Sequence, residues 1–146
     1  MREIKFRGKR IDNNEWIYGS LVIEEGGHYR IIVKCRGYTV KPETVGQYIG
    51  LKDEYEKKVY DGDILASRGR GEFYNLRFIV NFGNSAHFPK DKEHQAYYLE
   101  AANEKTKMQI ENGMRNDIYF WLYSSETECR VVGNIHDNPE LIKEVE

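Results

Sequence analysis

The sequence has few of the residues that crosslink a protein or anchor it in a membrane. Its two cysteines, Cys35 and Cys129, lie far apart in the chain, so we expect no disulfide framework of the secreted type. We predict two reduced, packed thiols, with a single long-range disulfide as the alternative. No apolar run approaches the roughly 20 residues of a membrane span, and residues 1–7 lack the apolar stretch of a signal peptide. A cytoplasmic protein without a membrane partner is expected.

An excess of charge of one sign is also lacking. The chain has 22 Lys and Arg against 24 Asp and Glu, a net charge of -2, so no global field directs it toward nucleic acid. What it does contain is aromatic surface, with 11 Tyr, 6 Phe and 2 Trp. These large side chains favour a folded core over disorder. The 146 residues suffice for one domain or two very small ones.

Alternation of apolar and polar residues dominates the sequence and predicts β-strands. In residues 16–23 apolar side chains occupy both parities, so we expect both faces of this strand to be covered. Gly26-Gly27 predicts a hairpin turn, and Asp61-Gly62 a tight turn. The predicted strands are Ile4–Phe6, Trp16–Ile23, His28–Lys34, Val45–Leu51, Val59–Tyr60, Ile64–Leu65, Phe73–Phe82, Ile118–Tyr123 and Arg130–Ile135.

Between these strands we expect a short connection bracketed by Gly37, Pro42 and Gly46, a turn or a short helical excursion over residues 52–58, and a loop over residues 68–71. Residues 95–108 leave two alternatives open: a strand around Tyr97–Leu99, or a helix favoured by Ala, Glu and Lys.

The C-terminal segment predicts a short helix. Asn138 is a suitable N-cap, Pro139 suits the first helical position, and Glu140 falls in the first turn. Leu141, Ile142 and Val145 would share one face and pack on the sheet. Together the elements indicate a mainly β fold, α+β at most, in the form of a small barrel or sandwich. A boundary between two parts would fall between Gly83 and Tyr97 or just before Arg68.

Three segments resemble the YopX family, small proteins encoded by bacteriophages and prophages. They are Arg2–Arg10 with Trp16–Gly19, Val45–Asp53 leading into Val59–Leu65, and Val132–Leu141. The resemblance runs from the first residue to about Leu141. The sequence departs from it at Ile49, where the family usually has Thr, and at Glu54–Lys57, where it usually has a Lys-Asn-Gly-Lys-like turn.

The resemblance implies a β-rich fold that includes a small SH3-like barrel, and an origin in a phage or prophage within a bacterial cytoplasm. We therefore expect one YopX-like unit over residues 1–146, with a β-barrel subdomain of about 1–67 and a second β-rich part of about 68–146 as a subdivision. The family brings no assigned activity and no catalytic residues.

The sequence offers no signature of catalysis. Asp61 and Asp63, with Asp53 nearby, could bind a cation, but too few oxygen ligands surround them, and turn formation is favoured. The spacing of His87 and His94 matches no metal site, and no nucleophile elbow or P-loop occurs. We expect no enzyme, no metal and no cofactor.

One cluster of cations suggests nucleic-acid binding. Residues 1–50 carry nine Lys and Arg against six Asp and Glu, a local charge of +3, and Tyr29 and Tyr38 are interleaved with some of them. Such a surface could track phosphates and stack bases, although cations on strands are also ordinary solvated residues. The latter interpretation is favoured. The candidate nucleic-acid residues are Arg30, Lys34, Arg36, Arg68 and Arg70.

The abundance of Tyr and Trp indicates an interaction surface, because these residues dominate interfaces. Residues 119–123 are aromatic or aliphatic at five successive positions, and one parity of a strand there would be left for a second element or subunit. We therefore predict a non-enzymatic protein-interaction or self-assembly module with an unknown macromolecular partner or a second copy of the chain. An accessory nucleic-acid-binding protein is the alternative. The candidate interface residues are Trp16, Tyr18, Tyr119, Trp121 and Tyr123.

Overall fold

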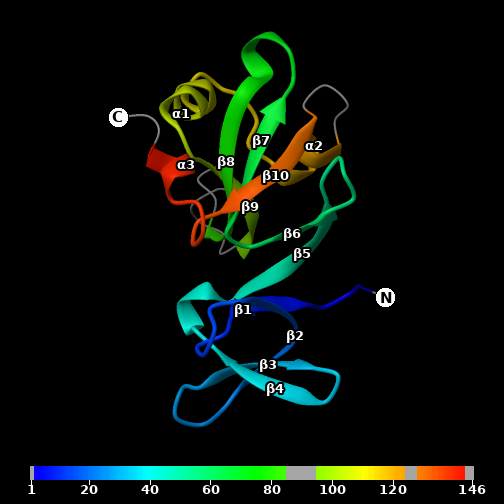
Figure 1. Ribbon diagram of the computed structural model, residues 1–146. Helices are drawn as coiled ribbons and strands as arrows, with labels where there is room; N and C mark the ends of the chain where they lie inside the picture. Colours follow the sequence, from blue (N-terminus) through cyan, green and yellow to red (C-terminus); the bar gives the residue numbers. More distant parts are fainter. Residues whose placement is uncertain (1, 85–94, 124–127, 144–146) are drawn as a thin grey trace. The chain divides into compact units, whose positions relative to one another are not determined.

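The computed structural model describes residues 2–84, 95–123 and 128–143, and these are mainly β-strands (Figure 1). The strands are β1 (Phe6–Lys9), β2 (Trp16–Ile23), β3 (Tyr29–Val33), β4 (Arg36–Val40), β5 (Gly46–Lys52), β6 (Lys58–Tyr60), β7 (Asp63–Arg68), β8 (Tyr74–Asn84), β9 (Gln95–Ala101) and β10 (Cys129–Asn134). The helices are α1 (Glu104–Glu111), α2 (Ile118–Tyr123) and α3 (Glu140–Lys143), with 3-10 turns η1 (Pro42–Thr44) and η2 (Gly71–Phe73). The predicted mainly β fold with a short C-terminal helix is confirmed.

The strands form two antiparallel sheets. One has the order β4-β3-β2-β1-β5-β6 and the other the order β10-β7-β8-β9. Each order begins and ends with a different strand, so the described strands do not close into a barrel.

The chain divides into two compact units, Met1–Gly50 and Leu51–Glu146, called unit 1 and unit 2 here. The division falls inside β5, whereas we expected subdomains of about 1–67 and 68–146. Residues just before Arg68 belong to unit 2 because β7 is an inner strand of its sheet, hydrogen-bonded to β10 on one side and β8 on the other.

In unit 1 the predicted hairpin at Gly26-Gly27 is confirmed. It joins β2 to β3, which pair from Ser20 with Ile32 to Ile23 with Tyr29. The core lies on the side of Leu21 and its partner Ile31, which is fully buried. On the same strands Gly19 is required by a close approach, since an added Cβ would stand 2.2 Å from the carbonyl oxygen of Ile32.

The expected connection around Gly37 is in part a strand, β4, that pairs along β3. The two strands are joined by Lys34 and Cys35, both with left-handed backbone (φ 46° and 66°), as in the turns of two-residue hairpins. The sequence conceals this turn because neither residue is the Gly or Asn that usually adopts such angles. Cys35 is therefore exposed, which corrects the expectation of a packed thiol there; Cys129 is buried, and both thiols are free.

The core of unit 2 forms around Trp121, which is fully buried and packs against Phe78 of β8 with ring centroids 4.6 Å apart. Trp121 lies on α2, so the predicted strand over residues 118–123 is wrong. Asp117 caps this helix, because its Oδ1 accepts a hydrogen bond of 2.9 Å from the backbone N–H of Phe120. The Trp121 indole also donates to the Arg115 carbonyl at 2.7 Å.

The two alternatives for residues 95–108 each hold for a part of that segment. Residues 95–101 form β9, paired along β8, and a helix begins after Asn103. Asn103 is its N-cap and accepts from the backbone N–H of Thr106 at 2.9 Å. The buried Thr106 hydroxyl in turn accepts from the N–H of Arg77 in β8 at 2.8 Å, which ties α1 to the sheet.

The predicted turn over residues 52–58 is organised by one buried carboxylate. Oδ1 of Asp53 accepts hydrogen bonds from the backbone N–H groups of Tyr55 and Lys57, both at 2.9 Å. Its Oδ2 accepts from the N–H of Val131 in β10 at 3.0 Å. Asp63 has a similar local role, since its Oδ2 accepts from the N–H of Tyr60 at 2.8 Å. These bonds confirm that turn formation is a role of these aspartates.

Replacing the Asp53 carboxylate should destabilise unit 2 selectively. Asp53→Ala removes three hydrogen bonds to a charged acceptor, so we expect the free energy of unfolding to fall by about 2–4 kcal/mol. Denaturant unfolding would be followed by the fluorescence of Trp121 in a Trp16→Phe background, which leaves a tryptophan in unit 2 alone. The matched control is Lys52→Ala, an exposed residue of the same hairpin, with an expected change within about 0.5 kcal/mol. Equal effects of the two substitutions would contradict this role of Asp53.

The two thiols should differ sharply in reactivity. Burial raises the pKa of Cys129 from 9.0 to about 12, whereas Cys35 is exposed. At about pH 8 a chromogenic disulfide should therefore modify one thiol in the folded protein and the second after unfolding. Cys35→Ser should abolish the fast phase; a fast phase that persists in this variant would contradict the burial of Cys129.

The raised pKa of Cys129 also makes the free energy of unfolding depend on pH. Above pH 9 this free energy should fall, because the thiol of Cys129 loses its proton in the unfolded chain before it does so in the folded protein.

Candidate interaction surface

The side chains that alternate outward from the core of unit 1 form a surface of aromatic and basic residues. Arg7 lies opposite Tyr18 and Lys9 opposite Trp16 in the β1–β2 ladder. The guanidinium carbon of Arg7 is 4.7 Å from the centroid of the Trp16 ring, and Nζ of Lys9 is 5.5 Å from it. Cations at these distances hold an aromatic ring in place by attraction to its π-electrons. We call the surface the outer face of β1–β3, made of Arg7, Lys9, Trp16, Tyr18, Val22 and Arg30.

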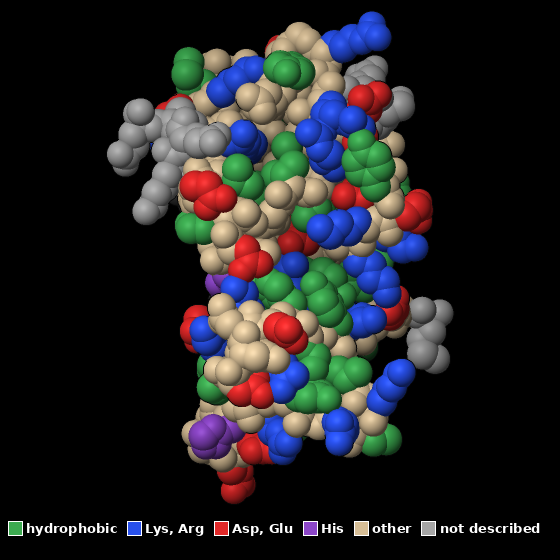
Figure 2. All heavy atoms as spheres, viewed as in Figure 1, with side chains coloured by type: hydrophobic (Ala, Val, Ile, Leu, Met, Phe, Trp, Pro, Cys, Tyr) green, Lys and Arg blue, Asp and Glu red, His purple; other side chains and the backbone are tan. Residues whose placement is uncertain are grey.

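This face is open, contrary to the expectation that both sides of residues 16–23 are covered. Tyr18 and Val22 are each 42% exposed, and Trp16 is half-buried. In the region of β1 to β4, Figure 2 shows hydrophobic side chains bordered by Lys and Arg side chains as well as by Asp and Glu side chains. An aromatic residue and an aliphatic one therefore remain accessible beside fixed positive charge.

Arg7 and Lys9 were not among the residues proposed from the sequence. The signal for them was available in the alternation of the first strand, which puts Arg7 and Lys9 on one side and Phe6 on the other. What the sequence could not supply is the register that brings those two cations to Trp16. Arg7 is only 5% exposed, so most of its surface packs against its neighbours.

The other predicted interface residues lie on α2 in unit 2. Tyr119 and Tyr123 are 64% and 67% exposed and stack on each other, four residues apart, with ring centroids 6.3 Å apart. Trp121, by contrast, has no exposed surface and belongs to the core, so its assignment to an interface is wrong. The error follows from the strand prediction, which gave residues 119, 121 and 123 one common face.

The predicted nucleic-acid residues are divided between the two units. Arg30, Lys34 and Arg36 belong to unit 1, whereas Arg68 and Arg70 belong to unit 2. Two of them are engaged: Arg30 donates to Glu24 Oε1 at 3.0 Å and to the Gly37 carbonyl at 3.1 Å. Arg68 forms an ion pair with Glu54. Lys34, Arg36 and Arg70 are exposed.

The structure shows no metal centre in its described part, where no group of three or more His, Cys, Asp and Glu side chains is placed to hold an ion. His87 and His94 lie outside the described residues. Within the described ranges, no helix has both the length and the hydropathy needed to cross a bilayer.

Comparison with known proteins gives a family and a fold. The family model of the YopX protein matches residues 5–143, nearly the whole chain. Among solved structures, the crystal structure of protein EF1440 from Enterococcus faecalis is similar, with a TM-score of 0.53 and 16% sequence identity over 97% of this chain and 99% of that one. No curated protein matches. Since the family match covers far more than half of the sequence, the chain belongs to the YopX family.

Proposed function

We propose that this protein acts without catalysis, as a module that binds an acidic segment of another protein through the outer face of β1–β3. The observation that supports it best is the contact of two cations with the Trp16 ring on an open sheet face that also carries the exposed Tyr18. Aromatic residues fixed in this way lose little conformational freedom on binding, and such residues are common hot spots.

Charge favours an acidic partner. Residues 1–50, which form unit 1, carry a net charge of +3, so they attract a segment rich in Asp and Glu. The aliphatic side chain of Val22 lies on the same face and suits an apolar side chain of the partner. Protein is favoured over nucleic acid because Arg30, one of the candidate nucleic-acid residues, is already bonded to Glu24.

We also propose that unit 1 has the strand arrangement of a small SH3-like barrel that is left partly open, as family membership suggests. Three features support this: β1 pairs with both β2 and β5, a 3-10 turn precedes β5, and Arg10 forms a bridge to Val40 at the end of β4. A phage or prophage origin and a cytoplasmic location are part of the same proposal. The free thiols of Cys35 and Cys129 fit a reducing compartment.

Selection from a random displayed peptide library tests the binding proposal without a known partner. We expect the peptides enriched on the full chain to combine Asp or Glu with an apolar residue. Replacing Trp16 and Tyr18 together by Ala should weaken their binding about tenfold or more, measured by fluorescence anisotropy.

The matched control replaces Tyr119 and Tyr123 by Ala, which removes two exposed aromatic rings from unit 2 and should leave peptide binding unchanged. Selected peptides that bind the Trp16 and Tyr18 variant equally well would overturn the proposal. So would tight binding of a single-stranded oligonucleotide that falls steeply with salt, because that is the behaviour of a nucleic-acid-binding surface. A dimer mass in sedimentation, lost with Trp16 and Tyr18, would instead identify the partner as a second copy.

A further inference from the structure

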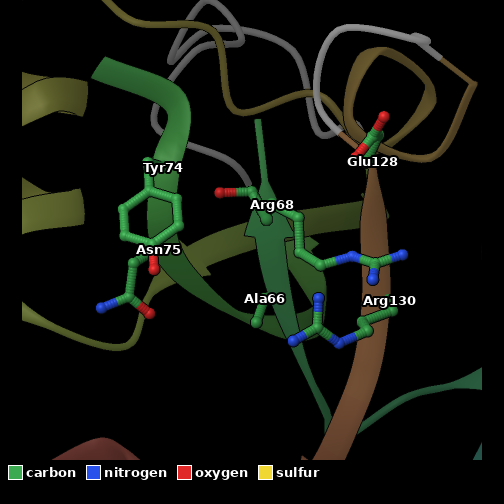
Figure 3. Close-up of a pocket in the computed structure, with 7 residues that line it drawn as sticks. Ala66, Arg68, Tyr74, Asn75, Glu128 and Arg130 are labelled. Carbon is green, nitrogen blue, oxygen red and sulfur yellow. The ribbon is translucent and has the colours of Figure 1, made fainter. Parts of the chain in front are cut away.

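A polar pocket of about 410 Å³ lies in unit 2, between the beginning of β8 and the beginning of β10 (Figure 3). Its volume falls within the roughly 300–1,000 Å³ typical of small-molecule sites. The pocket, called the Arg130 pocket here, is lined by residues of unit 2, whereas the outer face of β1–β3 belongs to unit 1. Its lining residues are Ala66, Ser67, Arg68, Tyr74, Asn75, Glu128 and Arg130.

Arg130 of β10 contributes a guanidinium group to the lining of the pocket. Arg130 is paired with Ala66 of the neighbouring strand β7. Because the alanine side chain is short, the Arg130 side chain can extend over β7, on the side of β8 (Figure 3). Nη1 of Arg130 is buried and has no hydrogen-bond partner among the described residues. A buried donor on a charged group without a partner is costly. The cost is removed if an acceptor enters the pocket.

Arg68 supplies a second guanidinium on the same side of the sheet. Its side chain extends from β7 toward β10 (Figure 3). Glu54 forms an ion pair with Arg68, and the Tyr55 ring centroid lies 5.2 Å from its guanidinium carbon. Partial burial lowers the pKa of Arg68, but the hydrogen bond to Glu54 and the negative charge of Glu54 raise it by more, so the pKa of Arg68 is raised overall. Arg68 therefore stays protonated, and its remaining N–H groups can serve a ligand.

The backbone around the pocket is irregular at three points. The register between β7 and β8 shifts between Ala66 and Arg68. Asn75 and Glu128 both have left-handed backbone, with φ of 56° and 44°. Strained residues and bulges cluster at functional sites, where they direct side chains to a ligand. Here they place the amide of Asn75 and the hydroxyl of Tyr74 on the side of the pocket formed by β8.

We propose that the Arg130 pocket binds the phosphate group of a phosphate monoester. Two guanidinium groups from different strands line the pocket, and together they offer more donors than the two oxygens of a carboxylate can accept, which suits the three terminal oxygens of a phosphate. The carboxylate of Glu128 points away from the Arg130 guanidinium and leaves the anion site open (Figure 3). This proposal is independent of peptide binding by unit 1.

Thermal unfolding and calorimetry of the full chain with phosphate probes test the pocket. At constant ionic strength, inorganic phosphate, phosphoserine and adenosine monophosphate should raise the midpoint of unfolding, whereas acetate should not. Tighter binding of phosphoserine than of the nucleotide would identify a phosphorylated side chain as the source, and the reverse order a free nucleotide. An equal response to acetate, or no response to any phosphate, would overturn the proposal.

Variants separate binding from a structural role. Arg130→Gln should raise the dissociation constant for phosphate about tenfold or more, while the midpoint without anion stays equal or rises, since an unpaired buried donor has been removed. Ala66→Val keeps both arginines but enlarges the side chain beside the Arg130 guanidinium, and should also weaken binding. The matched control is Arg115→Gln, an exposed arginine paired with Asp117 in the same unit, which should respond like the wild type. A full phosphate response in Arg130→Gln would refute the assignment.

Discussion

The arrangement of unit 2 depends on the hydrogen bonds of the Asp53 carboxylate. Two of them close the turn after β5, and the third joins that turn to Val131 in β10. The backbone N–H of Glu54 reinforces the junction by donating to the Cys129 carbonyl at 3.3 Å. β10 is consequently fixed on both sides, by β7 in the sheet and by the turn. Arg130, which lies between Cys129 and Val131, has its backbone position set by these contacts.

The same turn also positions the other arginine of the pocket. Glu54 pairs with Arg68, and Tyr55 lies against its guanidinium. These two residues fall in the stretch where this sequence departs from the Lys-Asn-Gly-Lys-like turn usual in its family. A bulkier turn is therefore not a neutral difference, since its side chains contact a residue that lines the pocket. The turn after β5 and the pocket are thus coupled in this chain.

The sequence predicted those parts of the fold that local pattern determines. Alternation and Gly-rich turns gave β2, β3, β5, β8 and β10, and Asn138 with Pro139 gave α3. It failed at residues 118–123, where a continuous apolar run has no period that separates a helix from a strand. Asp117, an N-cap just before that run, was the overlooked signal. The contacts of Trp16 with Arg7 and Lys9, and the pocket of Arg68 and Arg130, depend on register and on pairing between distant strands, which no local pattern contains.

A buried hydrogen-bond donor without a partner among the described residues affects how much of the protein is present in a cell. The buried donor of Arg130 lowers the free energy that separates the empty form from the unfolded ensemble, which intracellular proteases attack. Any anion held there would lengthen the half-life of the polypeptide, so its steady-state abundance would follow the supply of that anion. The rate at which the protein is degraded would then depend on the concentration of the anion, without any conformational change.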